Sequence, residues 1–167
     1  MQLFHFTSAR HLRPISKHGL TVGDVPTDIY RQRGKIGVWL TSNGTNKGHG
    51  LSASKERYRL SINIPDSDRA LVKWDRWFPG NVTDRTAHFL HSTAENFESW
   101  YIYFGFIPAE LITDVHDMSL DQPVEDWANV QQSAEHDVVA VPPTRFAVRR
   151  WQKRMLKGVQ RYLRRNQ

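Results

Sequence analysis

Two side chains near the start of the chain have the residue types and the spacing needed to position a ligand hydroxyl group. Leu3 and two phenylalanines alternate with polar residues around His5, as in a short strand, and Thr7 follows directly. Because side chains two residues apart on a strand point to the same face, His5 and Thr7 can contact one ligand. An imidazole nitrogen and a hydroxyl group can each hold a ligand hydroxyl in one orientation. A histidine between phenylalanines is also typical of a core or edge strand, so the pair is a candidate site only.

The motifs of several common chemistries are absent from the sequence. It contains no cysteine, which excludes disulfides and thiol nucleophiles and favours a reducing compartment. The one close pair of histidines, His88 and His91, has few acidic neighbours, so we expect no metal site. There is no nucleophile elbow, no glycine-rich phosphate loop and no glycine fingerprint of a dinucleotide-binding fold. Common hydrolase, kinase and dehydrogenase functions are therefore disfavoured.

The elements that position His5 and Thr7 can be predicted from apolar periodicity and from breaking residues. A helix that begins after Thr7 or Ser8 can end at Gly19, because glycine adopts left-handed backbone geometry with little conformational energy. The expected order is a strand over 2–6, a helix over 9–17, a loop over 21–34, a strand around 38–40 and a flexible loop over 43–50.

The second half of the domain has one strongly periodic segment. Tyr58 to Ile64 alternates apolar and polar residues, which predicts a strand with one buried face and one solvated face, ended by Pro65. The remaining expectations are two or three short helices within 66–99, a strand over 100–106 covered on both faces and closed by Pro108, a surface loop over 114–126 and a last strand over 138–141.

The charge is divided sharply between two parts of the chain. Residues 143–167 contain nine of the 23 Lys and Arg and no Asp or Glu, whereas residues 1–142 contain the other 14 basic residues and all 17 acidic ones. The net charges are therefore +9 and −3. We divide the chain into a domain over 1–142 and a basic C-terminal helix over 143–167, in which the apolar residues fall on one face: Val148, Trp151, Met155, Val159 and Tyr162.

An unbalanced basic helix favours an anionic partner. Contacts from Lys and Arg to phosphate give affinity that does not depend on sequence, so we favour nucleic acid or a ribonucleoprotein, with a protein acceptor as an alternative. A packed helix with a solvated charged face and an interfacial membrane helix are the other interpretations. The residues expected to bind the partner are Arg149, Arg150, Lys153, Arg154, Lys157, Arg161 and Arg164.

No segment has the length and composition of a membrane span or of a secretion signal. The longest apolar-rich stretch, Trp100–Ile112, contains Glu110 and falls short of the roughly 18 residues that a span requires. The first fifteen residues lack the basic and then apolar order of a signal peptide. We therefore expect a cytoplasmic location.

The order of these elements resembles the ADP-ribosyltransferase fold of diphtheria-toxin-like enzymes, DNA-targeting ADP-ribosyltransferase toxins and RNA 2′-phosphotransferases. In those enzymes an aromatic residue, His, one residue and Thr lie on the first strand, a helix ends at Gly-Leu or Gly-Ile, and a second strand ends in Ser or Thr. The matching positions here are Phe4, His5, Phe6, Thr7, His18, Gly19, Leu20, Trp39, Leu40, Thr41 and Ser42. The run from Trp100 to Ile112 is similar to the strand and proline turn that close the same fold. The resemblance covers roughly residues 2–115.

The resemblance implies an α+β fold in which split mixed sheets surround an NAD cleft, with flanking helices. It implies that NAD is a substrate and that ADP-ribose is transferred to a protein or a nucleic acid. His5 would then be catalytic and hold the nucleotide, and the expected cofactor-binding residues are His5, Phe6, Thr7, Gly19, Leu20, Trp39, Thr41, Ser42 and Tyr58. An aromatic ring such as Tyr30, Trp39 or Tyr58 could stack on nicotinamide.

The expected catalytic carboxylate is Glu98. Breaking the bond between nicotinamide and ribose builds oxocarbenium character on the sugar, and a carboxylate that binds the ribose 2′-hydroxyl and orients the nucleophile assists this step. Related transferases place a Glu at the start of the strand that corresponds to Trp100–Phe106, and Glu98 comes just before it, with Glu95 as the second choice.

Two other functions remain open. If neither Glu acts, the chain is closer to the RNA 2′-phosphotransferases, which grip a phosphate with His and several Arg. Arginines available for that role are Arg10, Arg31, Arg33, Arg57 and Arg59. The other alternative is a catalytically silent protein of the same fold that binds or inhibits a macromolecular partner through the basic helix.

Overall fold

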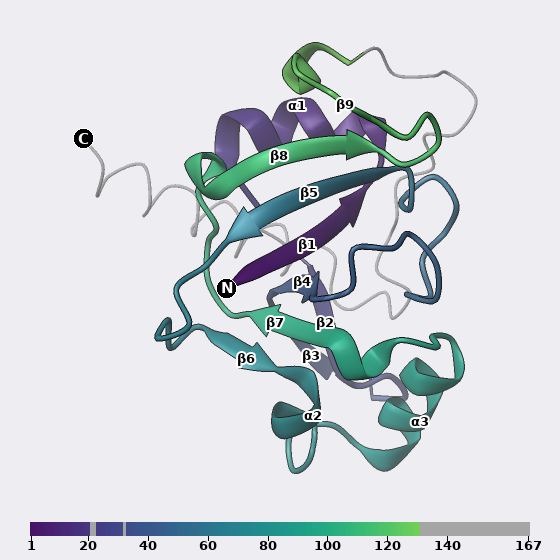
Figure 1. The fold of residues 1–167 in the computed structure, drawn as a ribbon. Helices are drawn as coiled ribbons and strands as arrows, with labels where there is room; N and C mark the ends of the chain where they lie inside the picture. Colours follow the sequence, from purple (N-terminus) through teal and green to yellow (C-terminus); the bar gives the residue numbers. More distant parts are fainter. Residues whose placement is uncertain (21–22, 32, 131–167) are drawn as a thin grey trace.

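The computed structural model describes residues 1–20, 23–31 and 33–130, which form an α+β fold around one seven-stranded sheet (Figure 1). The strand order is β6-β7-β4-β1-β5-β8-β9, and β2 and β3 form a separate two-stranded sheet. The strands are β1 (Gln2–Thr7), β2 (Asp24–Asp28), β3 (Arg33–Ile36), β4 (Val38–Thr41), β5 (Tyr58–Asn63), β6 (Leu71–Lys73), β7 (Trp100–Tyr103), β8 (Ile112–Asp117) and β9 (Gln122–Pro123). The helices are α1 (Ala9–His18), α2 (Trp74–Trp77) and α3 (Asp84–Ser92), with short 3-10 turns η1 (Phe97–Ser99), η2 (Ala109–Leu111) and η3 (Trp127–Asn129).

The first strand and helix form as the sequence predicts. The buried side chains of α1, Leu12 and Ile15, are three residues apart on one helix face and pack under the sheet. The helix ends where Gly19 adopts a φ of 66° and its N–H donates to the Ile15 carbonyl. The next residue, Leu20, pairs with Ile107, which fixes the end of α1 to the turn after β7.

The sheet consists of two halves that are joined weakly at β1 and β4. β1 pairs with β5 over its whole length, but a single Cα pair, Phe4 with Thr41, joins it to β4. α1 lies against the half made of β1, β5 and β8, whereas α2 and α3 lie at the other end of the sheet (Figure 1). The expected split into separate sheets is therefore not found, because β1 and β4 join the two halves in one sheet, and their short pairing lies beside His5.

Two apolar cores lie on opposite faces of the sheet. Alternate residues of β4 show this directly, because Val38 and Leu40 belong to the core under α1, whereas Trp39 packs with the second core. Trp74 is fully buried in the second core, among the rings of Trp39, Trp77, Phe78 and Trp100. The side chains of Leu3 and Leu60 belong to the first core. Leu3 lies on the same face of β1 as His5, and Leu60 pairs with His5, so this face of β1 packs against the first core.

Several expectations about the elements are wrong. The strand pairs of the described residues are all antiparallel, so the sheet is not mixed. The expected loop over 21–34 contains β2 and part of β3, and the expected loop over 114–126 contains most of β8 and all of β9, because pairing with neighbouring strands compensates for their polar composition. β7 ends at Tyr103, and its residues alternate between buried and half-buried, so it is covered fully on one face only. The short strand β6 was not expected.

The expected strand over 138–141, the domain boundary at 142 and the basic helix over 143–167 lie outside the described residues. Among the described helices, none has the length and apolar character needed to span a membrane.

Candidate functional site

The candidate site is built around His5, which lies on β1 where the two halves of the sheet part. Its Nδ1 atom lies 2.9 Å from the carbonyl oxygen of Trp39 on β4. Because a carbonyl oxygen can only accept a hydrogen bond, Nδ1 must carry the proton in the neutral ring. The other nitrogen, Nε2, is then an acceptor.

The surroundings of His5 keep its ring neutral. Burial lowers the pKa of His5 to about 4, against an ordinary value of 6.5. The hydrogen bond to Trp39 opposes this shift, and the neighbouring His11 and Lys55 add to it. At neutral pH, Nε2 of His5 is therefore an unprotonated acceptor beside cationic groups.

A cationic cluster surrounds this ring at the N-terminus of α1. The hydroxyl oxygens of Thr7 and Ser8 lie 3.3 and 3.2 Å from Nδ1 of His11, and Nε of Arg10 donates to Nε2 of the same ring at 3.3 Å. Because Nε2 of His11 accepts from Arg10, its Nδ1 donates to the two hydroxyl groups. The structure thus brings Thr7 into the same cluster as His5.

Lys55 reaches the cluster from the loop before β5. Thr7 pairs with Tyr58, so the residues just before Tyr58 lie beside the start of α1. Burial and the charge of Arg10 both lower the pKa of Lys55. Within the described part of the chain, the groups whose charge lowers the pKa values of His5 and Lys55 are His11, Lys55 and Arg10. Sequence analysis missed His11 and Lys55; the four-residue spacing of Thr7 and His11 was the available signal for the first.

Trp39, which was expected to stack on nicotinamide, has its ring on the face of β4 opposite to the first core. Trp39 is half-buried, its ring lies 5.3 Å from that of Trp100, and its Nε1–H donates to the Asp24 carbonyl at 2.7 Å. Its backbone carbonyl, not its ring, contacts His5. Phe6 also points away from His5, and its ring stacks on that of His49 at 5.0 Å.

The other candidate aromatic rings have separate environments. Tyr58 is 2% exposed and lies in the core under α1, next to Arg57. Tyr30 is 61% exposed in the connection between β2 and β3, with the Arg85 guanidinium 4.1 Å from its ring centroid. Gly19 and Leu20 contact the turn at Ile107 and so fix α1 in place.

Glu98 lies in η1, immediately before β7, and is exposed. Its neighbour Ser99 is bonded to the end of β4: the hydroxyl oxygens of Ser99 and Thr41 are 2.7 Å apart, and Ser99 donates to the Asn96 carbonyl. The hydroxyl of Thr41 therefore donates to Ser99 and accepts from the N–H of Asn43. Ser42 is exposed, and its N–H donates to the Ser99 carbonyl. Thr41 and Ser42 thus anchor the turn that presents Glu98.

The arginines named for the phosphate-binding alternative are separated by the structure. Arg10 belongs to the cationic cluster, whereas Arg57 pairs with the buried carboxylate of Asp117 at 3.0 Å. Arg59 donates to the Gly44 carbonyl, and Arg31 lies 3.8 Å from Asp28. Arg33 is exposed on β3. Over the described ranges, no group of three or more His, Cys, Asp or Glu side chains could hold a metal ion.

Comparisons with known proteins assign no family to the chain. No family model matches it, and no curated protein matches it. Among solved structures, it is similar to the Scabin toxin from Streptomyces scabies in complex with NADH, with 14% identity and a TM-score of 0.40, over 74% of this chain and 68% of the toxin chain. A similarity at this level indicates that the two folds overlap in part, and it does not assign a function to this chain.

Proposed function

We propose that the protein binds NAD at His5 and transfers its ADP-ribose group to a protein or nucleic acid. The observation that carries this proposal is the neutral His5 ring, fixed by the Trp39 carbonyl with Nε2 left as an acceptor. Such a nitrogen can accept a hydrogen bond from a ribose hydroxyl, and Thr7 on the same strand face lies beside it.

The cationic cluster supports a ligand that carries phosphate groups. Lys55 lies near His5, Arg10 lies near Lys55, and the first turn of α1 contains no acidic residue. Lysine and arginine side chains at a helix N-terminus favour anions, because the positive end of the helix dipole adds to their charge. A dinucleotide offers hydroxyl groups for His5 and a pyrophosphate for these cations.

We assign the carboxylate role to Glu98. In the transfer, the bond from ribose C1′ to the nicotinamide nitrogen breaks, and nicotinamide leaves with the bonding electron pair. An acceptor nitrogen or oxygen then forms a bond to C1′, and its proton passes to the Glu98 carboxylate. Anchoring of η1 by Thr41 and Ser99 would hold Glu98 at the start of β7.

Removal of a 2′-phosphate from RNA is the second candidate function. The observation that favours it is the grouping of Arg10, His11 and Lys55 beside His5, while Glu98 is exposed on η1. A cluster of this kind can bind a phosphate monoester without help from a carboxylate. In either reaction the basic segment over 143–167 would contact the anionic partner.

The first test measures NAD binding by calorimetry. We expect His5→Ala to weaken binding by about tenfold, because the ribose hydroxyl loses its acceptor. His88→Ala is the matched control, since His88 is an exposed histidine on α3. Equal affinity of the wild type and His5→Ala would overturn the assignment of this site.

The second test separates the candidate reactions. NAD labelled on its adenine side is incubated with total cell lysate, and Glu98→Ala is compared with Glu95→Ala, which removes the neighbouring exposed carboxylate. Label that is incorporated by the wild type and lost in Glu98→Ala supports ADP-ribose transfer, and nuclease or protease digestion then names the acceptor. NAD consumption only in the presence of 2′-phosphorylated RNA would select the second candidate. Binding of NAD without turnover would favour the catalytically silent alternative.

A further inference from the structure

We propose that the basic segment over residues 143–167 docks within its own molecule on the acidic surface formed by β8, β9 and η3. Its apolar residues would occupy a hollow beside Trp127, and its cations would lie against the surrounding carboxylates. This contact would withhold the segment from an external partner. The proposal does not depend on NAD chemistry, and its test needs no NAD.

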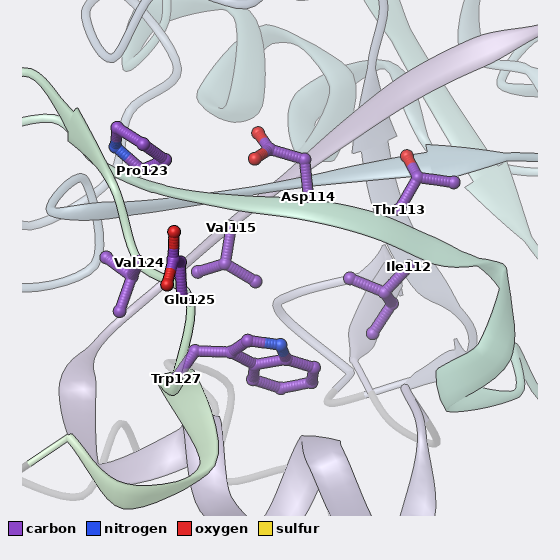
Figure 2. A pocket seen from close by; sticks show the side chains of 8 residues that line it. All are labelled: Ile112, Thr113, Asp114, Val115, Pro123, Val124, Glu125 and Trp127. Carbon is purple, nitrogen blue, oxygen red and sulfur yellow. The ribbon is translucent and has the colours of Figure 1, made fainter.

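The hollow lies between β8 and the segment from Pro123 to Trp127 and has a volume of about 180 Å³. Figure 2 shows the side chains of Ile112, Val115, Val124 and Trp127 gathered on one side of β8. Val115 is buried, whereas the other three are half-buried and retain accessible apolar surface. Ile112, Val124 and Trp127 also pack against the core, and most of the accessible lining of the hollow is polar, so an occupant would meet a few apolar edges and the polar groups around them.

The strand and turn residues that border this hollow are acidic, whereas the neighbouring helix α1, which contacts η3, contains Arg10, Arg13 and Lys17. Residues 105–130 contain six Asp and Glu and no Lys or Arg. Asp117 is neutralised by Arg57, but Asp114 and Glu125 line the hollow and are exposed, and their carboxylates make no hydrogen bond or ion pair with the described residues. A cationic occupant is therefore favoured over an anionic one.

The basic segment has the complementary composition. It contains nine cations and no anion, and its apolar residues recur at helical spacing (Val148, Trp151, Met155, Val159 and Tyr162). One face of such a segment can rest on the apolar side chains that border the hollow while the cations on its flanks meet carboxylates.

The connection is long enough for this contact to form within one molecule. The described chain ends at Val130, three residues after Trp127, which lines the hollow. Residues 131–142 can span up to about 40 Å when extended, at about 3.3–3.6 Å per residue. A tether of this length keeps the segment at high effective concentration near the hollow, which favours it over a second copy of the chain.

The test uses the absence of cysteine from the sequence. We would introduce Gln122→Cys on β9 and Gln160→Cys in the basic segment, attach spin labels and measure the distance between them in the full-length protein. Ser67→Cys with Gln160→Cys is the matched control, because residue 67 lies in the connection to β6, at the opposite edge of the sheet. We expect a short and narrow distance distribution for the first pair and a longer one for the control pair.

Two perturbations separate the charge contribution from the apolar contribution. Asp114→Lys with Glu125→Lys should lower the ratio of docked to free segment by at least about 5-fold, because two attractive pairs become repulsive. Asp75→Lys with Glu95→Lys changes the net charge equally at exposed acids elsewhere and should leave the ratio unchanged. Trp151→Ser, outside the described fold, should also lower the ratio although every charge is retained.

Three results would overturn the proposal. The first is a broad, long distribution for the Gln122 and Gln160 pair at low salt. The second is a short distance that the reversal of Asp114 and Glu125 leaves unchanged. The third is a short distance that also arises in a mixture of singly labelled molecules, because it would assign the hollow to a second copy of the chain.

Discussion

Replacement of His5 by Gln tests the protonation state on which the candidate site depends. The ordinary pKa of histidine is 6.5, and burial lowers that of His5 to about 4. At about 1.4 kcal/mol per pH unit, the difference corresponds to about 3 kcal/mol of folding free energy. Glutamine keeps an amide that can donate to the Trp39 carbonyl but does not titrate.

The sign of the effect follows from which state binds the proton. Above pH 6.5, His5 is neutral in the folded and unfolded chains, so its contribution is fully present. Between pH 6.5 and about 4, the unfolded chain takes up a proton that the folded chain does not, and stability falls. Below about 4, both states are protonated and the contribution is lost.

The assay is urea unfolding at several pH values from about 3.5 to about 8, a range that begins below the pKa of His5 in the folded chain, about 4, and ends above the ordinary value of 6.5. We expect the stability of the wild type minus that of His5→Gln to decrease by about 3 kcal/mol from pH 7 to pH 4. The subtraction removes the other titrating groups, including His91, whose pKa is also lowered by burial. A difference that stays constant over this range would refute the neutral His5, and with it the acceptor role of Nε2.

Three further outcomes follow from other contacts. Gly19→Ala should destabilise the protein by about 1–3 kcal/mol in urea unfolding, because φ is 66° and a Cβ atom would overlap the Ile107 carbonyl oxygen. Asp117→Ala should lower the melting temperature by an amount equivalent to about 1–3 kcal/mol, because the N–H and hydroxyl groups of Ser119 and the half-exposed Arg57 lose the buried carboxylate that accepts from them. If the proposed site is correct, Lys55→Ala should weaken NAD binding in calorimetry by about 5-fold to 10-fold, since a cation beside the pyrophosphate is lost.

The elements with strong local signals could be predicted from the sequence. β1, α1 and β5 each have an apolar periodicity that matches their geometry, and α1 ends at Gly19, where the structure has positive φ. These features depend on residues close together in the chain, so their type and approximate bounds could be read without knowledge of the fold.

The hairpin of β2 and β3 and the strand β8 could not be predicted in this way. Val25 is the one fully buried apolar residue of β2, and it packs into the core around Trp74, which comes much later in the chain. β8 reads as a loop because two aspartates and a histidine lie within it. Its Asp117 is tolerated at 3% exposure because Arg57 pairs with it across the sheet. The β2–β3 hairpin and β8 are therefore determined by contacts with residues far away in the chain.

The chemistry of the candidate site also depends on contacts between distant parts of the chain, which local sequence patterns cannot predict. The pattern around His5 and Thr7 identifies the strand face, but it cannot assign a protonation state. The pKa of His5 is set by burial, by the hydrogen bond to the Trp39 carbonyl and by the neighbouring His11 and Lys55. Lys55 lies beside His5 only because β5 pairs with β1 in the register that joins Tyr58 to Thr7. A shift of that register by one residue would turn the side chains of β5 to the opposite face and change the residues that precede it. The register of β1 and β5 therefore determines whether a strand histidine becomes a neutral acceptor in a cationic corner or an ordinary core residue.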